Sequence, residues 1–185
     1  KFTVVGDENQ AIFNSHITFT EIEGILSGYH NQVKTYHLQK SYRSSGAITE
    51  TFNKLIASNR QVEPVQPTGE AVIKVRTKNH EAFKILVENK LAEKGVSSVT
   101  VITKTSHERR EVLALFDDNL IRQKKVVVLS IMLAKGLEFD HMILYDVSDK
   151  NYVSEQEKRL LYTAVSRGMK SLTITYKNQL TLFFN

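Results

Sequence analysis

An arginine at the end of a predicted helix is the first residue whose position suggests chemistry. The stretch "RLLYTAVSRGMKSL", residues 159–172, has the apolar spacing of a helix that runs into a strand, and Arg167 falls where that helix should end, just before Gly168. An arginine there either complements the negative end of the helix dipole or is held towards an anion such as a nucleotide phosphate. A phosphate-cradling G-x-x-x-x-G-K-[ST] segment is absent from the sequence. Both interpretations of Arg167 therefore stay open at this point.

Three further groups of polar residues follow predicted strands. They are Gly6, Asp7 and Gln10, then Tyr42, Arg43 and Ser44, and then Ser130 with the segment "LAKGLEFD" at residues 133–140. Ligands gather at the carboxyl ends of the strands in an open parallel sheet, so we expect these groups and Arg167 to lie at that edge. Each group taken alone is also explained by turn formation or helix capping. Four such groups, two of them with an arginine, favour a binding site.

The composition is that of a globular protein with a mild positive charge. The chain has 185 residues, which suits one domain or one domain plus a piece of a neighbour. Hydrophobic residues make up 41% and charged residues 24%, which is ordinary for a protein with a packed core. A net charge of +5 is compatible with nucleic acid as a partner and equally with a normally solvated surface.

The absence of cysteine, the spacing of the histidines and the length of the apolar runs argue against disulfides, metal sites and membrane spans. The sequence has no cysteine, which excludes disulfides and thiolate metal sites and favours an intracellular, cytoplasmic protein. No two of the six histidines have a metal-ligand spacing, so we expect no metal site. The longest apolar-rich run, residues 126–134, is far too short to span a membrane, so we expect no membrane partner. Because the chain opens on a strand-like segment without Met, we expect it to be a fragment of a longer protein.

Apolar strands that alternate with helices predict the fold class. The predicted strands are residues 2–5, 33–38, 71–76, 98–103, 126–130, 141–147 and 171–176. The predicted helices are residues 21–26, 44–56, 81–94, 106–116 and 155–167, and the clearest loop is residues 59–69. Strands of consecutive Val, Ile and Leu are typical of a mostly parallel sheet covered on both faces. The sequence therefore predicts an α/β domain with three layers.

Four segments resemble, in order, the motifs of a known enzyme family. They are "VVGDENQAIF" at residues 4–13, "LQKSYRSS" at 38–45, "LSIMLAKGLEFDHMIL" at 129–144 and "EKRLLYTAVSRGMKSL" at 157–172. They resemble motifs III, IV, V and VI of superfamily 1 DNA helicases of the UvrD/Rep type. This resemblance implies a RecA-like domain of the P-loop NTPase type that lacks its own phosphate loop. The four motifs are spread over nearly the whole chain.

The closest resemblance is to the helicase IV/HelD branch of that family. The segments "GDENQAIF" and "KSYRSSGAIT" resemble the corresponding motifs of this branch. UvrD and Rep carry a large insertion between motifs IV and V, whereas here Arg43 and Lys135 are only 135 − 43 = 92 positions apart. That spacing leaves room for the motor fold without a large insertion.

The resemblance also implies a division of the chain and a shared ATP site. Residues 1–28 are expected to be a remnant of a first RecA-like motor domain, with the motif III strand, and residues 29–185 to be the second motor domain. Helicases of this family bind ATP between the two domains. The first domain carries the phosphate loop and the acidic motif for Mg, so the expected cofactors are ATP and Mg bound mainly by that missing N-terminal domain.

Eight residues receive roles from the resemblance, and three of them are catalytic. Arg167 resembles the motif VI arginine finger, and Arg43 resembles the motif IV arginine that also reaches the γ-phosphate. Such cations neutralise charge on the transferring phosphoryl group, and a lysine lacks their planar fork. Gln10 is expected to sense the γ-phosphate and to relay its presence towards the nucleic acid.

The other five residues are expected to bind the nucleotide or the nucleic acid. Tyr42 would stack on adenine, Glu138 would bind the ribose, and Gly136 would let the backbone approach the phosphates. For nucleic acid, Ser130 stands where the family usually has a DNA-contacting Thr, and Phe13 is the aromatic residue nearest to the position of a base-stacking Trp.

These expectations define one function and two alternatives. The chain is expected to be part of an ATP-dependent DNA helicase or translocase, with DNA and the N-terminal motor domain as partners, and to be inactive alone. One alternative is an ATP-driven, HelD-like factor that remodels RNA polymerase. The other is a RecA-like binding scaffold without catalysis, against which the retained Arg43, Glu138 and Arg167 argue.

Overall fold

Five parallel strands form the larger sheet in the described part of the chain. The computed structural model describes residues 3–12, 17–29 and 33–184. The strands are β3 (Ile73–Arg76), β4 (Val99–Thr103), β5 (Val126–Ser130), β6 (Phe139–Leu144) and β7 (Gly168–Tyr176). Their order in the sheet is β3-β7-β6-β4-β5, and all four neighbouring pairs are parallel. The predicted α/β class with a mostly parallel sheet is confirmed.

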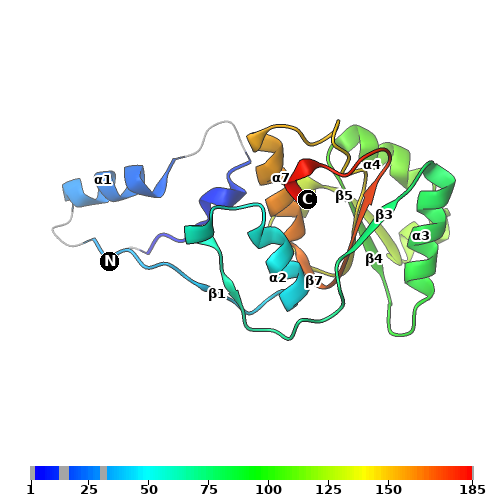
Figure 1. Cartoon of the computed structure of the whole chain (residues 1–185), viewed down its shortest axis with the longest axis horizontal. Coiled ribbons are helices and arrows are strands. Elements are labelled where there is room, and N and C mark those ends of the chain that lie inside the picture. Colours follow the sequence, from blue (N-terminus) through cyan, green and yellow to red (C-terminus); the bar gives the residue numbers. More distant parts are fainter. Residues whose placement is uncertain (1–2, 13–16, 30–32, 185) are drawn as a thin grey trace.

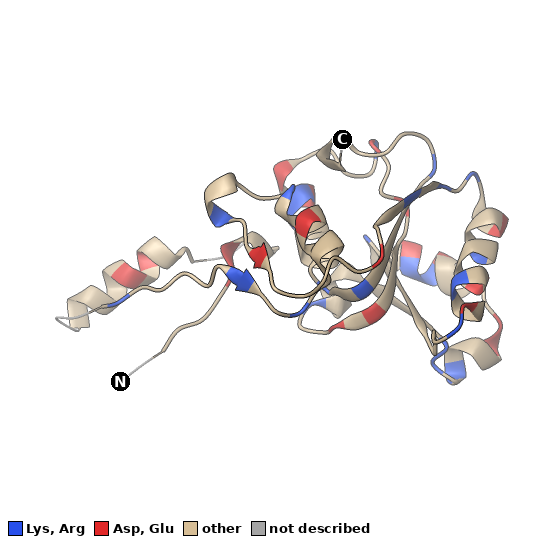
Figure 2. Ribbon diagram, turned by 60° about the horizontal axis from the view of Figure 1, so that its bottom comes forward, with Lys and Arg blue, Asp and Glu red and all other residues tan. Residues whose placement is uncertain are grey.

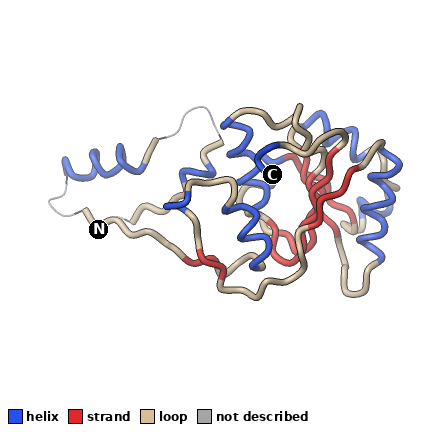
Figure 3. Tube along the Cα trace, viewed as in Figure 1, coloured by secondary structure: helices blue, strands red, loops and turns tan. Residues whose placement is uncertain are grey.

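Helices cover both faces of this sheet (Figure 1). One apolar cluster lies under α2 (Gly46–Asn53), α6 (Ile131–Ala134) and α7 (Glu155–Val165). The other lies under α3 (His80–Ala92), α4 (Ser106–Leu113) and α5 (Asp118–Arg122). Side chains along β6 alternate between them, because Met142 and Leu144 belong to the first cluster and Ile143 to the second. The result is the predicted three-layer arrangement, which Figure 3 shows as a central group of strands between helices.

The amino-terminal part of the chain lies apart from the sheet. Helix α1 (Phe19–Tyr29) extends away from the body of the domain (Figure 1). It contains the predicted helix at residues 21–26 and is longer than expected. Its Ile25 and Tyr29 are exposed. Within the part of the chain that the structure describes, none of the helices combines the length and apolar character needed to traverse a bilayer.

Two predicted strands in this region are wrong. Residues 3–5 and 33–38 are irregular, and residue 2 of the first predicted strand lies outside the described residues. Val5 is 80% exposed, and Tyr36 and Leu38 are exposed as well. A strand needs a neighbour to pair with, and neither segment lies beside the sheet. Only the short β1 (Lys40–Ser41) pairs, in parallel, with β2 (Glu63–Pro64), which lies in the predicted loop at residues 59–69.

Capping residues set the helix boundaries. Thr105 and Glu108 form a capping box at the start of α4, and Ser154 and Glu157 form another at the start of α7. Helix α7 ends at Val165, two residues before the predicted end. Short 3-10 helices complete the structure at Glu8–Gln10 (η1), Ser58–Arg60 (η2) and Leu182–Phe184 (η3).

Charged residues of both signs are distributed over the domain. Figure 2 shows Lys and Arg interspersed with Asp and Glu on the helices and on the amino-terminal arm. The net charge of +5 is therefore not gathered on one element. Function has to be sought in particular contacts rather than in the overall charge.

Gly69 and Gly95 allow a test of how tightly the loop before β3 packs on α2. Both have positive φ, +71° and +90°, but a Cβ at Gly69 would lie 2.7 Å from the Cβ of Ser45, whereas a Cβ at Gly95 meets open space. Gly95→Ala should lower the free energy of unfolding by about 1–2 kcal/mol, from backbone strain alone. Gly69→Ala should cost about 1–3 kcal/mol more, because the clash adds to the strain. Urea unfolding of both variants measures the difference, and equal losses would contradict the close packing.

Candidate functional site

Glu138 and Arg167 meet at the amino edge of the sheet. Strand β6 begins at Phe139 and β7 at Gly168, and the amide of Phe139 donates to the carbonyl oxygen of Arg167 at 2.9 Å. Both charged residues thus immediately precede paired parallel strands. The expectation that they lie at the carboxyl edge is wrong. Arg167 follows a helix rather than a strand, and the segment that contains Glu138 returns across the sheet before β6 begins.

The guanidinium of Arg167 is buried and does not extend into solvent. The residue is only 4% exposed. Its Nε donates to the carbonyl oxygen of Thr163 at 3.1 Å, and its Nη2 donates to Ser166 Oγ at 3.1 Å and to Gln10 Oε1 at 3.0 Å. The contact with Gln10 joins residues 157 positions apart. Arg167 therefore does more than complement the end of α7.

Asp7 connects Gln10 to α7. One oxygen of its carboxylate, Oδ2, accepts from Gln10 Nε2 and from the hydroxyl of Tyr162, each at 2.9 Å. The other oxygen accepts from the amide of Asn9 at the start of η1. Sequence reasoning missed Tyr162. Its position on the same predicted helix as Arg167, within the motif VI segment, was the available signal.

Arg43 and Glu138 form an ion pair at the rim of the site. Arg43 Nε lies 2.6 Å from Glu138 Oε1, and the two side chains are 43% and 42% exposed. Arg43 reaches this edge because Ser44 Oγ donates to the carbonyl oxygen of Gly168 at 2.6 Å and the amide of Ser45 donates to that of Met169. An ion pair this exposed contributes little to stability, so its two partners are available for exchange with a ligand.

The electrostatic environment of Arg167 favours an incoming anion. Burial lowers the pKa of Arg167, and the nearby positive charge of Arg43 lowers it further. Glu138, Tyr162 and Asp7 oppose this shift only in part. Burial, together with the Asp7 carboxylate, raises the pKa of Tyr162, which keeps its hydroxyl protonated as a donor. An anion that approached the two arginines would offset both the lost hydration and the repulsion between them.

Tyr42 directly precedes Arg43, and Gly136 lies two residues before Glu138. Tyr42 is 65% exposed, and its carbonyl oxygen accepts from Gln66 Nε2 at 2.8 Å. Its ring is therefore open to stacking. Gly136 has φ +85° in the turn after α6, a conformation that favours glycine. Its neighbour Lys135 donates from Nζ to the carbonyl oxygen of Gln10 at 3.2 Å.

Of the two residues expected to contact nucleic acid, the described one, Ser130, is not brought to this cluster. Ser130 ends β5 at the opposite, carboxyl edge of the sheet and is 1% exposed. Its hydroxyl has no hydrogen-bond partner among the described residues, and it does not reach the surface. Phe13 lies outside the described residues.

The described residues also show how potential metal ligands are placed. Over residues 3–12, 17–29 and 33–184, no group of three or more His, Asp or Glu is placed to hold a metal ion. Both carboxylate oxygens of Asp7 accept from donors of the chain, and Glu138 Oε1 pairs with Arg43.

Comparisons with known proteins found a matching family model and similar solved structures. A family model of the UvrD-like helicase C-terminal domain matches residues 125–175, a range that includes Glu138 and Arg167. Among solved structures, the C-terminal domain of a possible DNA helicase from Lactobacillus plantarum WCFS1 is similar, with 31% sequence identity and a TM-score of 0.63. The match covers 78% of this chain and 92% of that one. No curated protein is significantly similar to the chain.

The contact between Tyr162 and Asp7 can be tested by removing one oxygen atom. Tyr162→Phe keeps the buried ring and deletes a hydrogen bond to a carboxylate, so the free energy of unfolding should fall by about 1.5–3 kcal/mol. Amide exchange in the segment Asp7–Gln10 should become faster, because Asp7 loses one of its anchors. The control is Tyr29→Phe on the exposed face of α1, which should change neither quantity. Equal stability of the two variants would show that the Tyr162 contact does not hold the segment.

Proposed function

The chain belongs to the family of UvrD-like helicase C-terminal domains, and we propose that it acts as the second RecA-like motor domain of an ATP-dependent DNA helicase or translocase. In this proposal it supplies arginines and adenine contacts to an ATP site that it shares with a preceding motor domain. Residues 1–28 would belong with that preceding domain, and residues 29–185 would form the second motor.

One observation carries the proposal. Two arginines from separate segments lie at one edge of the sheet, and the buried one has a lowered pKa. The γ-phosphate is the anion that fits such a pair, because charge spreads over its three oxygens as the bond to ADP breaks. Arg167 and Arg43 would neutralise that charge with donors that are already in place. Arg167 is held by Thr163 on the helix side, which leaves Gln10 as the partner that a phosphate would replace.

Gln10 is suited to the role of a γ-phosphate sensor. Its side-chain oxygen accepts from Arg167, its side-chain nitrogen donates to Asp7, and its carbonyl oxygen accepts from Lys135. A phosphate that displaced Gln10 from Arg167 would therefore change the contacts of the whole segment Asp7–Gln10. Through this exchange, ATP binding would alter the contacts of the amino-terminal arm.

The remaining nucleotide contacts would come from the rim. Tyr42 would stack on adenine, Glu138 would accept from the ribose after releasing Arg43, and Gly136 would allow a close approach of the backbone. The phosphate loop and the Mg ligands would come from the first motor domain, since the sequence has no such loop. The proposed contacts of Ser130 and Phe13 with nucleic acid stay predictions, and Ser130 would first have to be uncovered.

A HelD-like remodelling factor is the second candidate. The 92 positions between Arg43 and Lys135 hold no large inserted domain, which is the feature that favours this branch. Such a factor would use the same arginines to hydrolyse ATP and would act on RNA polymerase. A non-catalytic scaffold is disfavoured, because it has no need of two arginines at one edge.

Arginine substitutions test the proposal in the chain joined to its phosphate-loop motor domain. Arg167→Ala should lower kcat for ATP about a hundredfold or more with little change in KM, since its charge acts on the transition state. Tyr42→Ala should raise KM with kcat largely kept, because a stacking ring binds the ground state and the transition state alike. The control is Arg159→Ala, an exposed arginine on the same helix. Parental turnover by Arg167→Ala would refute the arginine-finger role.

The isolated chain should have no ATPase activity. Residues 1–185 lack a phosphate loop, so we expect only weak nucleotide binding and no measurable phosphate release. A phosphate-release assay on the purified chain and on its Arg167→Ala variant gives the answer. Steady turnover that is lost in the variant would contradict the shared site.

A further inference from the structure

Open α/β sheets ordinarily bind ligands in a crevice at the carboxyl ends of two neighbouring strands. In this chain, the corresponding strands are β4 and β6. Strand β4 continues through α4 and α5 to β5 on one side, whereas β6 continues through α7 to β7 on the other. Such a reversal is the topological switch point of the sheet. Helices α4 and α7 both begin there, so the positive ends of two helix dipoles meet at the crevice.

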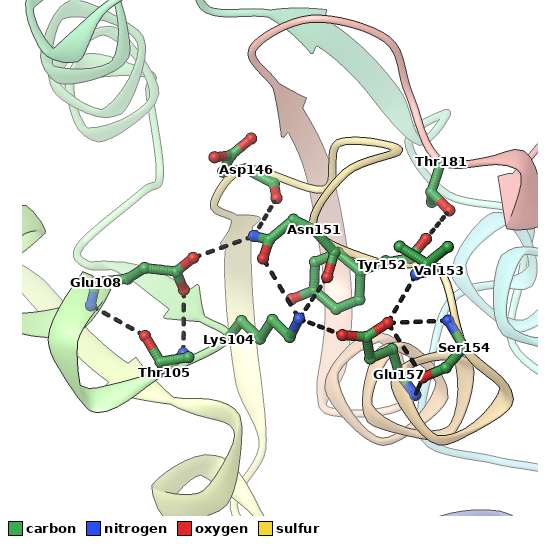
Figure 4. Close-up of polar contacts among 10 residues, drawn as sticks. All are labelled: Lys104, Thr105, Glu108, Asp146, Asn151, Tyr152, Val153, Ser154, Glu157 and Thr181. Carbon is green, nitrogen blue, oxygen red and sulfur yellow. Dashed lines mark hydrogen bonds and ion pairs between the residues drawn. The ribbon is translucent and has the colours of Figure 1, made fainter.

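The chain's own carboxylates already occupy both helix starts (Figure 4). Glu108 accepts from the amide of Thr105 at 3.0 Å in the capping box of α4. Glu157 accepts from the amides of Val153 and Ser154 at 2.7 and 2.9 Å in the capping box of α7. The positive ends of both helices are therefore already neutralised by carboxylates of the chain, which disfavours an anionic ligand there.

Lys104 and Asn151 join the two capping boxes. Lys104 Nζ donates to Glu157 Oε1 at 2.5 Å and to the carbonyl oxygen of Asn151, and it lies 5.1 Å from the centre of the Tyr152 ring. The side chain of Asn151 donates to Glu108 Oε1 at 3.1 Å. Figure 4 shows Lys104 between the two boxes, directed towards Glu157. The starts of α4 and α7 are thus held in one network.

The ion pair in this network is protected from solvent. The side chains of Lys104 and Glu157 are 18% and 23% exposed. Burial opposes ionisation of Glu157, but hydrogen bonds from Lys104 and from the backbone of Val153 and Ser154 lower its pKa to about 2. Glu157 is therefore ionised at neutral pH, and its contact with Lys104 is less screened than a contact on the surface.

Helix α7 connects this network to the site at the opposite edge. Its eleven residues span about 16 Å. Leu161, Ala164 and Val165 bury one face of the helix in the core, and Arg167 follows its last turn. A helix transmits a displacement along its axis with little loss, because its backbone hydrogen bonds keep its length. A displacement of its first turn would therefore be expected to move Arg167.

We propose that Lys104 and Glu157 are positioning residues for Arg167. Their ion pair fixes the start of α7, and the helix carries this constraint to the guanidinium at its other end. Only the catalytic consequence of this inference rests on the proposed function. The geometric consequence concerns the chain itself and is tested separately.

The geometric test uses the 185-residue chain and the NMR signal of the Arg167 Nε proton, which is hydrogen-bonded to Thr163. Lys104→Met should shift this signal and speed its exchange with water about tenfold or more, since a loosened α7 opens the contact more often. The matched control is Lys90→Met on α3. Lys90 is 11% exposed and pairs with Glu70 and Glu93 at 3.0 and 2.7 Å, so its loss removes a comparable ion pair away from α7.

Glu157→Gln is the second variant for this test. It keeps an acceptor for the amides of the capping box and removes only the charge that Lys104 pairs with. It should affect the Arg167 signal in the same direction as Lys104→Met. An unchanged Arg167 signal in either folded variant, or an equal change in Lys90→Met, would overturn the positioning role.

The catalytic test uses the chain joined to its phosphate-loop motor domain. Lys104→Met should lower kcat about tenfold or more and leave KM for ATP within about twofold, whereas Lys90→Met should keep both. In the Arg167→Ala background, Lys104→Met should lower kcat no further, because its effect passes through the missing arginine. Additive losses would overturn the inference. The proposed function fails if the unsubstituted joined chain does not turn over ATP, or if Arg167→Ala keeps the full turnover. In that case the proton-exchange measurement alone decides the positioning role.

Discussion

The backbone hydrogen bond from Phe139 to Arg167 begins the pairing of β6 with β7, and the arrangement of the site depends on that register. Both strands run in the same direction, so the residues that precede them arrive at the same edge of the sheet. The crossover through α7 returns the chain to this edge, as a parallel pair requires. Glu138 and Arg167 are therefore brought together by the backbone, before any contact between side chains forms.

Burial of the Arg167 guanidinium has a cost that the amino-terminal segment helps to offset. A charge taken out of water needs hydrogen bonds to most of its donors. Thr163 and Ser166 supply acceptors from α7, and Gln10 supplies one from the other end of the chain. Because Gln10 is also bound to Asp7, the arginine and the segment stabilise each other. An anion that replaced Gln10 would keep the arginine satisfied and remove one of the contacts that hold the segment against α7.

The two edges of the sheet have opposite characters. At the carboxyl edge, between β4 and β6, the helix starts are capped by Glu108 and Glu157 and joined through Lys104. At the amino edge, the pair formed by Arg43 and Glu138 is about 40% exposed, and the pKa of Arg167 is lowered by burial and by Arg43. The edge that usually binds ligands is thus internally neutralised, whereas the other edge holds two arginines. This asymmetry makes the amino edge the more favourable of the two for an anionic ligand.

The sequence by itself determined the elements of the sheet domain, because apolar runs such as residues 126–130 and caps such as Ser154 with Glu157 act over a few neighbouring residues. Through motif order it also predicted Arg43, Glu138 and Arg167 as site residues, and their roles stay predictions. Only the tertiary structure decided that residues 3–5 and 33–38 form no strand, since pairing needs a partner that local sequence does not specify. The amino-edge location of Arg167 and its link through Gln10 and Asp7 to Tyr162 were likewise decided there. These contacts join residues about 155 positions apart, and such pairs leave no periodic or local signal in a single sequence.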